Sequence, residues 1–203
     1  MAKVTITTFL TLDGVMQSPG APEEDPGGGF DLGGWLAPYA DEDMARHIAG
    51  WFDRADAFLL GRHTYEIFAA YWPHVSDDED PVIAKRLNGL PKYVASTTLD
   101  RLSWNNSTLL SGDVVDAVRK LREQPGRELQ IHGSGALARS LMAHDLIDEY
   151  RLLTYPVILG KGTRLFTEGA VPTALHLTSS ATTRSGIALH TYELRGRPTF
   201  GSM

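Results

Sequence analysis

Residues 128–142, ELQIHGSGALARSLM, hold the pattern that decides the fold. Residues 129–131 are a short, largely apolar run after the Pro125-Gly126 break, which predicts a strand. The next six residues fit G-x-G-x-x-A, and Leu137 and Leu141 recur behind them at helical spacing. The stretch therefore predicts a strand, a glycine turn and a helix in immediate succession.

A turn of this kind has a specific physical use. Glycine has no Cβ, so the backbone can turn sharply and approach a ligand closely. The helix that follows offers unpaired N–H groups and the positive end of its dipole, which together seat a phosphate or pyrophosphate. The same pattern also occurs in tight turns that bind nothing, and the stretch alone leaves both interpretations open.

The composition is that of a globular protein with a real core, because 42% of the 203 residues are hydrophobic and 22% are charged. No linker divides the chain, so we expect a single domain over residues 1–203. The formal net charge of −6 argues against a nucleic-acid partner. The absence of cysteine excludes disulfides, thiolate catalysis and cysteine-ligated metals.

The N-terminus runs directly into a strand pattern and lacks the apolar core of a signal peptide. No apolar run approaches the roughly 18 residues that a membrane span requires. We therefore expect a soluble, cytoplasmic protein without a membrane partner.

The N-terminal part predicts a strand and a long loop. Val4 and Ile6 begin an alternation of apolar and polar residues that predicts a half-buried strand over residues 3–12. Residues 14–34 contain seven glycines, and a loop of this length inside a domain is usually functional or disordered. Its position directly after the first strand suggests an active-site lid, with a solvated surface insertion as the alternative.

A second glycine turn follows in the middle of the chain. Residues 57–60 form a short apolar run that predicts a buried strand, and residues 65–71 predict a helix. Arg62 stands between them, directly after Gly61. An arginine at such a turn can fork onto a phosphate, although a surface arginine is the simpler interpretation.

The remaining elements alternate for most of the length. We expect helices over 42–52, 81–88 and 114–121, strands over 92–96 and 106–110, a strand over 149–159 that Pro156 interrupts, and closing strands over 175–183 and 187–194. This order predicts an α/β fold with a central, mostly parallel sheet flanked by helices and a C-terminal antiparallel hairpin.

Several chemistries fit the sequence poorly. None of the seven histidines belongs to an H-E-x-x-H pair, and we predict no metal site. The loop at Lys161 lacks the Walker frame, and Ser134 lacks the flanking glycines of a hydrolase elbow. A dinucleotide with an extra phosphate would use both glycine turns, Arg62 and the lid. The usual Rossmann order does not fit, because its glycine motif belongs on the first βα turn.

Two further motifs carry a resemblance. Residues 58–66, FLLGRHTYE, closely resemble the strand, turn and helix of dihydrofolate reductases. Residues 12–16, LDGVM, resemble the start of the reductase domain at the C-terminal end of the bifunctional riboflavin-biosynthesis deaminase–reductase. Gly133-Ser134-Gly135 matches the glycine turn of both groups. Over nearly its whole length the chain resembles a stand-alone member of the dihydrofolate reductase-like family that includes this domain.

The resemblance implies NADPH as the cofactor and hydride transfer as the reaction. Arg62 would meet the 2′-phosphate, residues 133–137 would hold the pyrophosphate, and Asp13 with Gly14 would lie near the nicotinamide. The residues implied for the cofactor are Gly14, Gly61, Arg62, His63, Thr64, Ser96, Thr97, Gly133, Ser134, Gly135, Ala136 and Leu137.

For the catalytic acid, the resemblance points to the helix after the lid. Dihydrofolate reductases place a carboxylate there, and Asp43 is nearest to that position, although Asp41 lies closer to the apolar face. Asp13 and Asp43 are therefore the candidate catalytic residues, with helix capping as the alternative for the acids at 41–43. Riboflavin-type reduction opens a ribose on a phosphorylated substrate, and Lys161 is either a contact for that phosphate or a solvated lysine.

The predicted function is an NADPH-dependent reductase of a small heterocyclic or ribosyl substrate, as in riboflavin biosynthesis. Reduction of dihydrofolate, another pterin, or a different small carbonyl or imine is one alternative. A non-catalytic NADP-binding module is the other. Family members commonly dimerise, so we expect a homodimer that uses the strand over 149–159 or the closing hairpin.

Overall fold

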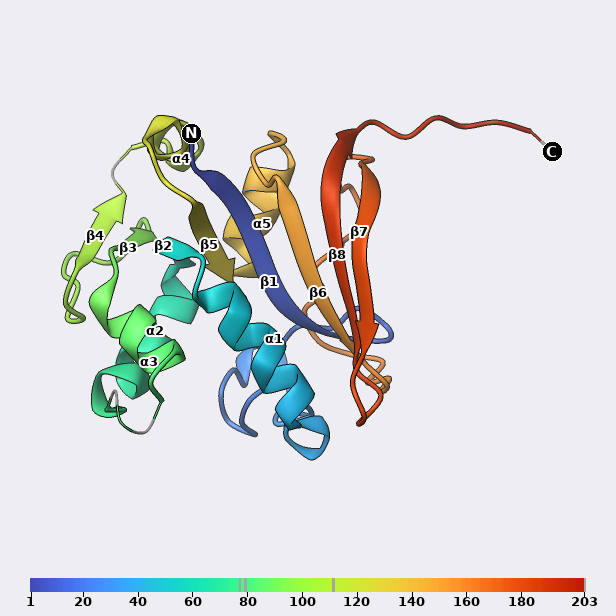
Figure 1. The fold of residues 1–203 in the computed structure, drawn as a ribbon, viewed down its shortest axis with the longest axis horizontal. Helices are drawn as coiled ribbons and strands as arrows, with labels where there is room; N and C mark the ends of the chain where they lie inside the picture. Colours follow the sequence, from blue (N-terminus) through green and yellow to red (C-terminus); the bar gives the residue numbers. More distant parts are fainter. Residues whose placement is uncertain (77, 79, 111, 203) are drawn as a thin grey trace.

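The computed structural model of the protein describes residues 1–76, 78, 80–110 and 112–202. In this part of the chain eight strands form one sheet in the order β4-β3-β2-β5-β1-β6-β8-β7 (Figure 1). The strands are β1 Lys3–Thr11, β2 Ala55–Gly61, β3 Lys92–Ala95, β4 Ser107–Leu110, β5 Glu128–His132, β6 Glu149–Tyr155, β7 Ala174–Thr182 and β8 Ala188–Gly196.

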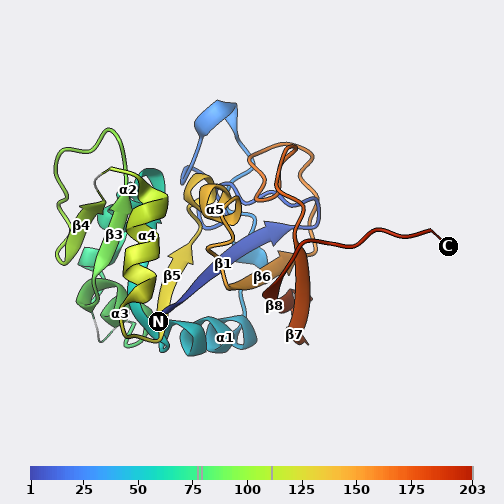
Figure 2. The same ribbon diagram turned by 90° about the horizontal axis from the view of Figure 1, so that it is seen from above.

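Helices cover both faces of the sheet. The described α-helices are α1 Glu42–Phe52, α2 Arg62–Tyr71, α3 Ile83–Gly89, α4 Val114–Glu123 and α5 Gly135–Met142. Seen from above, α4 and α5 lie on one side of the sheet and α1 on the other (Figure 2). Leu141 of α5 packs in the core with Ile6 and Ile131, whereas Phe52 of α1 packs in a second core with Phe58.

The pairing confirms the predicted architecture. Strands β1 to β6 pair in parallel with their neighbours, whereas β8 pairs antiparallel with both β6 and β7. A parallel sheet needs cover on both faces, and the central strand β1 is accordingly buried along most of its length. Within the described residues, no helix combines the length and apolarity needed to cross a membrane.

Two of the predicted boundaries were wrong for reasons that the contacts show. The strand predicted over 149–159 ends at Tyr155, because Pro156 has no N–H for the ladder and the Val157 N–H donates back to the Tyr155 carbonyl oxygen at 2.8 Å. The helix predicted from residue 81 begins at Ile83. Asp80 caps the Ile83 N–H at 2.6 Å, so the turn between them is closed by a side chain and is not yet α-helical.

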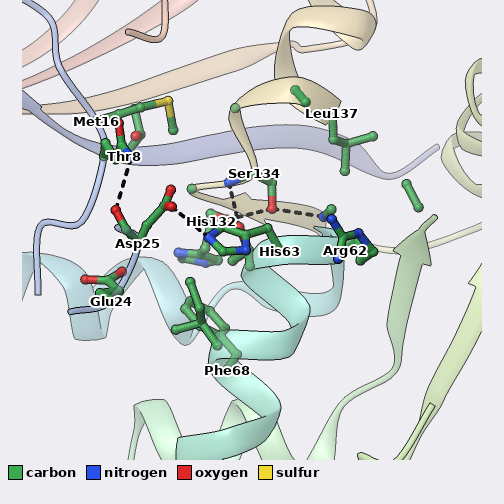
Figure 3. A pocket seen from close by; sticks show the side chains of 18 of the residues that line it. Thr8, Met16, Glu24, Asp25, Arg62, His63, Phe68, His132, Ser134 and Leu137 are labelled. Carbon is green, nitrogen blue, oxygen red and sulfur yellow. Dashed lines mark hydrogen bonds and ion pairs between the residues drawn. The ribbon is translucent and has the colours of Figure 1, made fainter. Parts of the chain in front are cut away.

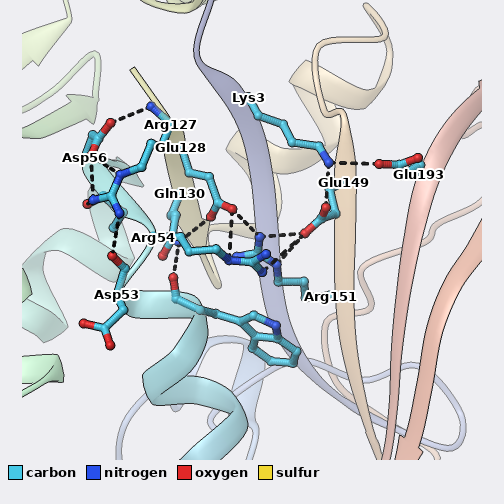
Figure 4. A network of polar contacts seen from close by, with 12 residues as sticks. Lys3, Asp53, Arg54, Asp56, Arg127, Glu128, Gln130, Glu149, Arg151 and Glu193 are labelled. Atoms are coloured by element: carbon cyan, nitrogen blue, oxygen red, sulfur yellow. Dashed lines mark hydrogen bonds and ion pairs between the residues drawn. The ribbon is translucent and has the colours of Figure 1, made fainter. Parts of the chain in front are cut away.

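A buried cluster of charges joins the three central strands. Arg151 on β6 is fully buried, and its guanidinium lies 2.8 Å from Glu128 of β5 and 2.6 Å from Glu149 of β6 (Figure 4). Lys3 of β1 pairs with Glu149 at 2.7 Å from the solvent side. Because buried charges are costly unless they are paired, these contacts constrain how β5, β1 and β6 align.

Replacing Arg151 tests this constraint. In Arg151→Leu, the buried Glu128 and Glu149 carboxylates lose their buried partner and keep only the partly exposed Arg54 and Lys3. We therefore expect the free energy of unfolding to fall by up to about 3–5 kcal/mol. Lys3→Met is the matched control at the exposed end of the cluster, and it should cost about 1 kcal/mol or less. Urea unfolding at pH 7 measures both, and equal losses in the two variants would contradict the proposed constraint.

Candidate functional site

The two glycine turns meet because β2 and β5 are parallel neighbours whose carboxyl ends reach the same edge of the sheet. Ser134 joins them. Its Oγ accepts the Gly61 N–H at 3.0 Å and donates to the His132 carbonyl oxygen at 3.0 Å. Its own N–H donates to Thr64 Oγ1 at 3.0 Å. Two turns that lie at least 70 residues apart in the sequence are thus held together at one point.

The late turn has a backbone shape that few residues adopt. Gly133 and Ser134 have φ angles of 55° and 51°, in the left-handed region. Serine is disfavoured there, and its hydrogen bonds offset the cost. A Cβ on Gly135 would come within 2.7 Å of the Met16 sulfur, so a glycine at this position lets the lid lie close to the start of α5.

Helices α2 and α5 both begin at this junction. Their N-caps are Gly61 and Ser134, and neither cap satisfies a first-turn N–H with its side chain. The helix predicted from residue 65 begins at Arg62, so the turn leads into it without an intervening loop. Two positive dipole ends with unpaired N–H groups therefore point toward the same space, which suits a phosphate or pyrophosphate.

That space is a pocket of about 1400 Å³ at the carboxyl ends of the parallel strands (Figure 3). Ligand sites commonly measure about 300–1,000 Å³, so the pocket is large enough for more than one small ligand. The residues that line its floor and walls include Thr7, Phe9, Ile48, Phe52, Phe68 and His132.

The pocket brings together most of the residues predicted for the cofactor. Every one of them except Gly14 lines it, namely Gly61, Arg62, His63, Thr64, Ser96, Thr97, Gly133, Ser134, Gly135, Ala136 and Leu137. Arg62 is half-exposed and pairs with Glu66 of its own helix at 3.1 Å. Ser96 Oγ accepts the N–H groups of Thr98 and Leu99, which shapes the turn after β3.

The glycine-rich loop predicted as a lid lies along this pocket. Met16 and Gln17 line it near the loop's start, and Glu24 and Asp25 line it further along. Asp25 Oδ1 lies 3.3 Å from Nε2 of His63, so the loop reaches the start of α2 (Figure 3). This contact places an acid from the loop beside His63, at the start of the helix that follows the second glycine turn.

Asp13 does not line the pocket. Its carboxylate accepts from the Thr11 hydroxyl at 2.6 Å and from the Gly160 N–H at 2.9 Å, and it pairs with Arg164 at 3.3 Å. The Thr11 hydrogen bond and the backbone N–H donors hold the pKa of Asp13 well below its usual range. Asp13 thereby fixes the base of the lid, as does the adjacent Gly14 with its φ of 79°. Their roles near the nicotinamide stay predictions.

Asp43 also lies outside the pocket lining. Arg184 and Arg46 bind its carboxylate at 3.1 and 2.9 Å, and Arg184 is the main reason why the pKa of Asp43 is lowered. Helix α1 instead presents Ile48 and Phe52 to the pocket. A catalytic role for Asp43 stays a prediction that this geometry does not support.

Two neighbouring charges have structural partners as well. Asp41 caps α1 through the Met44 N–H at 2.8 Å, as the capping alternative expected. Lys161 pairs with Asp31 at 2.5 Å and does not line the pocket, so its contact with a substrate phosphate is left without support.

The sequence reasoning missed the pocket residues that belong to strand interiors and to the far side of the lid. Thr7, His132 and Asp25 carry no local motif, because they meet residues from distant parts of the sequence. One signal was present for His132, which immediately precedes the glycine turn and therefore had to lie at the strand's carboxyl end.

These features define a class of protein. The strand order, the closing antiparallel strands and the pocket at the carboxyl ends make a dihydrofolate reductase-like α/β fold. Within that class, the chain belongs to the RibD C-terminal domain family, whose model matches residues 2–189.

Comparison with individual proteins agrees with this placement. YyaP, an uncharacterized protein of Bacillus subtilis (strain 168), is 27% identical over 157 residues, which make up 77% of this chain and 82% of YyaP. A Shewanella sp. PV-4 protein named for riboflavin biosynthesis has a TM-score of 0.67 at 22% identity, covering 96% of this chain and 99% of its own.

A Thermotoga maritima diaminohydroxyphosphoribosylaminopyrimidine deaminase/5-amino-6-(5-phosphoribosylamino)uracil reductase has a TM-score of 0.62 at 14% identity. The match covers 95% of this chain and 56% of that protein. At these identities the two solved structures support the fold alone.

The junction at Ser134 yields a stability prediction. Ser134→Ala removes the acceptor of the Gly61 N–H and leaves that partly buried donor unpaired, so we expect a loss of about 1–3 kcal/mol. Ser179→Ala, on the exposed part of β7, is the control and should change the free energy of unfolding by less than about 0.5 kcal/mol. Urea unfolding compares them, and a Ser134→Ala protein as stable as the control would show that the hydrogen bond is dispensable.

Proposed function

We propose that this protein is an NADPH-dependent reductase that transfers hydride to a small heterocyclic or ribosyl substrate, as pyrimidine reductases of the riboflavin pathway do. The observation that carries the proposal is the junction at Ser134, where the N-termini of α2 and α5 open onto one pocket. Membership of the RibD C-terminal domain family supports the reductase activity.

The residues at the junction fit the phosphates of such a cofactor. Gly133 and Gly135 add no side chain to the turn, and the first-turn N–H groups of α5 are available to a pyrophosphate. Arg62 is half-exposed at the start of α2, and its ion pair with Glu66 is a surface contact that a phosphate can replace. Ser96 and Thr97 lie on the next strand end and add hydroxyl groups.

The cofactor, when bound, supplies the hydride. The chain supplies position and exclusion of water. Phe9, Phe52 and Phe68 give the pocket apolar walls, and the lid residues Gln17 and Asp25 lie across it. Gln17 Nε2 donates to the carbonyl oxygens of Asp25 and Gly27 at 3.0 and 2.9 Å, so the lid is held in shape by its own side chains.

Dihydrofolate as the substrate has less support. That chemistry uses a carboxylate on the helix after the lid, and the pocket-facing positions of α1 are Ile48 and Phe52. Reduction of another small carbonyl or imine fits the same pocket. A non-catalytic NADP-binding module is the second candidate, because neither Asp13 nor Asp43 lines the pocket. Oxidation of NADPH by candidate substrates separates the enzyme from the module.

Three further features belong to the proposal. We propose that residues 1–203 act as one domain, that the protein forms a homodimer, and that it acts in the cytoplasm. The continuous eight-stranded sheet supports the first of these.

Replacing Arg62 tests the assignment of the 2′-phosphate. In Arg62→Ala, one charge-assisted contact worth about 1.5–3 kcal/mol is lost, so the Kd for NADPH should rise about 10- to 100-fold while the Kd for NADH stays within about twofold. Fluorescence titration at fixed salt measures both. Arg46→Ala is the control, because Arg46 is an exposed arginine on α1.

Equal effects of Arg62→Ala on NADPH and NADH would overturn the role of Arg62 but not the binding of a dinucleotide. Binding of neither cofactor to the unmodified protein would overturn the reductase proposal as a whole.

A further inference from the structure

Two residues of the pocket floor belong to a row of residues in register on three neighbouring strands. Thr7 of β1 is in register with His132 of β5 on one side and with Arg151 of β6 on the other. Residues in register on adjacent strands share one face of a sheet. Thr7 and His132 line the pocket, whereas Arg151 does not and lies 5.7 Å from the ring of Trp51.

The amide of Gln130 has one possible orientation. Its Nε2 lies 2.6 Å from the Trp51 carbonyl oxygen and 2.6 Å from Glu128 Oε2 (Figure 4). Both partners are acceptors, since Glu128 is held as a carboxylate partner of the Arg151 guanidinium at 2.8 Å. Only the NH₂ end of an amide can face two acceptors, so Oε1 must face His132.

This orientation fixes the proton on His132. Nε2 of His132 lies 3.1 Å from Gln130 Oε1, which accepts, so Nε2 is the protonated nitrogen. Burial, reinforced by the charge of Arg151, lowers the pKa of His132 to about 3, and the ring is therefore neutral at pH 7. Nδ1 is then an unprotonated acceptor, and within the described residues the hydrogen bond of this ring is the one at Nε2.

Thr7 supplies a second group without a partner. The residue is 3% exposed, and its Oγ1 makes no hydrogen bond within the described part of the chain. Buried hydroxyls are nearly always paired, so an orphan beside a pocket indicates a ligand contact. Thr5 Oγ1 and Arg151 Nη1 share this lack, but neither residue lines the pocket.

We propose that Thr7 and His132 form a subsite that holds the amide edge of a flat, uncharged ring. Nδ1 of His132 accepts from the ligand N–H, and the Thr7 hydroxyl donates to the ligand carbonyl oxygen. Phe52 stacks on the imidazole with ring centroids 4.3 Å apart and an interplanar angle of 23°, which fixes the plane of the ring, and the hydrogen bond from Nε2 to Gln130 selects its orientation in that plane.

Two ligands of the proposed reductase carry such an edge. One is the carboxamide of the nicotinamide, and the other is the lactam edge of a pyrimidine- or pterin-like substrate. The choice of these ligands rests on the proposed function. The position of the proton on His132 does not, because it follows from the contacts of Gln130 alone.

The test reads His132 directly, by NMR of protein labelled with ¹⁵N-histidine. Without ligand, the His132 imidazole should show the neutral Nε2–H tautomer and should not titrate between pH 5 and 8. His132→Phe identifies the signal, and exposed His47 in α1 provides a second histidine signal for comparison. A protonated ring, or the Nδ1–H tautomer, would overturn the proposal before any ligand is added.

Two matched ligand pairs then separate the sources of the amide edge. NADPH is compared with its 3-acetylpyridine analogue, which lacks the carboxamide N–H, and uracil is compared with 1,3-dimethyluracil, which has no N–H. In at least one pair, the N–H ligand should move the Nδ1 resonance and its blocked analogue should leave it in place. No shift in either pair, or equal shifts within both pairs, would refute the subsite.

The two proposals fail separately. If fluorescence shows no NADPH binding while uracil still moves Nδ1, the reductase proposal fails and the subsite stands. If NADPH binds without moving Nδ1, and uracil does not move it either, the subsite fails and the reductase proposal stands.

Discussion

The hydrogen bonds of Ser134 are the constraint on which the pocket depends. They tie the turn after β5 to the turn after β2, although 73 residues separate Gly61 from Ser134. A left-handed serine is costly by itself, and its cost is offset only when both turns are in place. The end of the pocket at the two glycine turns therefore forms as a unit, with α2 and α5 starting from the same point.

Much of this arrangement could be predicted from the sequence, because glycine turns and helix starts are local signals. Gly61 and Gly133 marked both turns, and the closing antiparallel strands followed from alternation around Gly186. The parallel neighbours β2 and β5 then had to bring the turns to the same edge of the sheet. The end of β6 at Tyr155 was harder to predict, because it depends on where a single proline interrupts the strand pattern.

The rest depends on contacts between distant residues. Nothing near Asp13 in the sequence shows that its carboxylate binds the Gly160 N–H and Arg164. The motif match instead predicted that Asp13 lies near the nicotinamide. The same limit applies to the pocket floor. Thr7 and His132 become neighbours through strand register, which a single sequence does not specify for strands so far apart.

Charge is distributed unevenly around the pocket, and the buried cluster is the reason. Arg151 lies beside the floor, in register with Thr7, but it does not line the pocket, and Glu128 and Glu149 bind its guanidinium. The same Glu128 holds Gln130, which in turn orients His132, while burial and the charge of Arg151 lower the pKa of the imidazole and keep it neutral. The electropositive helix starts are thus confined to the glycine turns, while the floor is polar without being charged. Recognition at the floor depends on the direction of hydrogen bonds. The ligand that matches the whole pocket best is negatively charged at the end near the glycine turns and uncharged at the end near the floor.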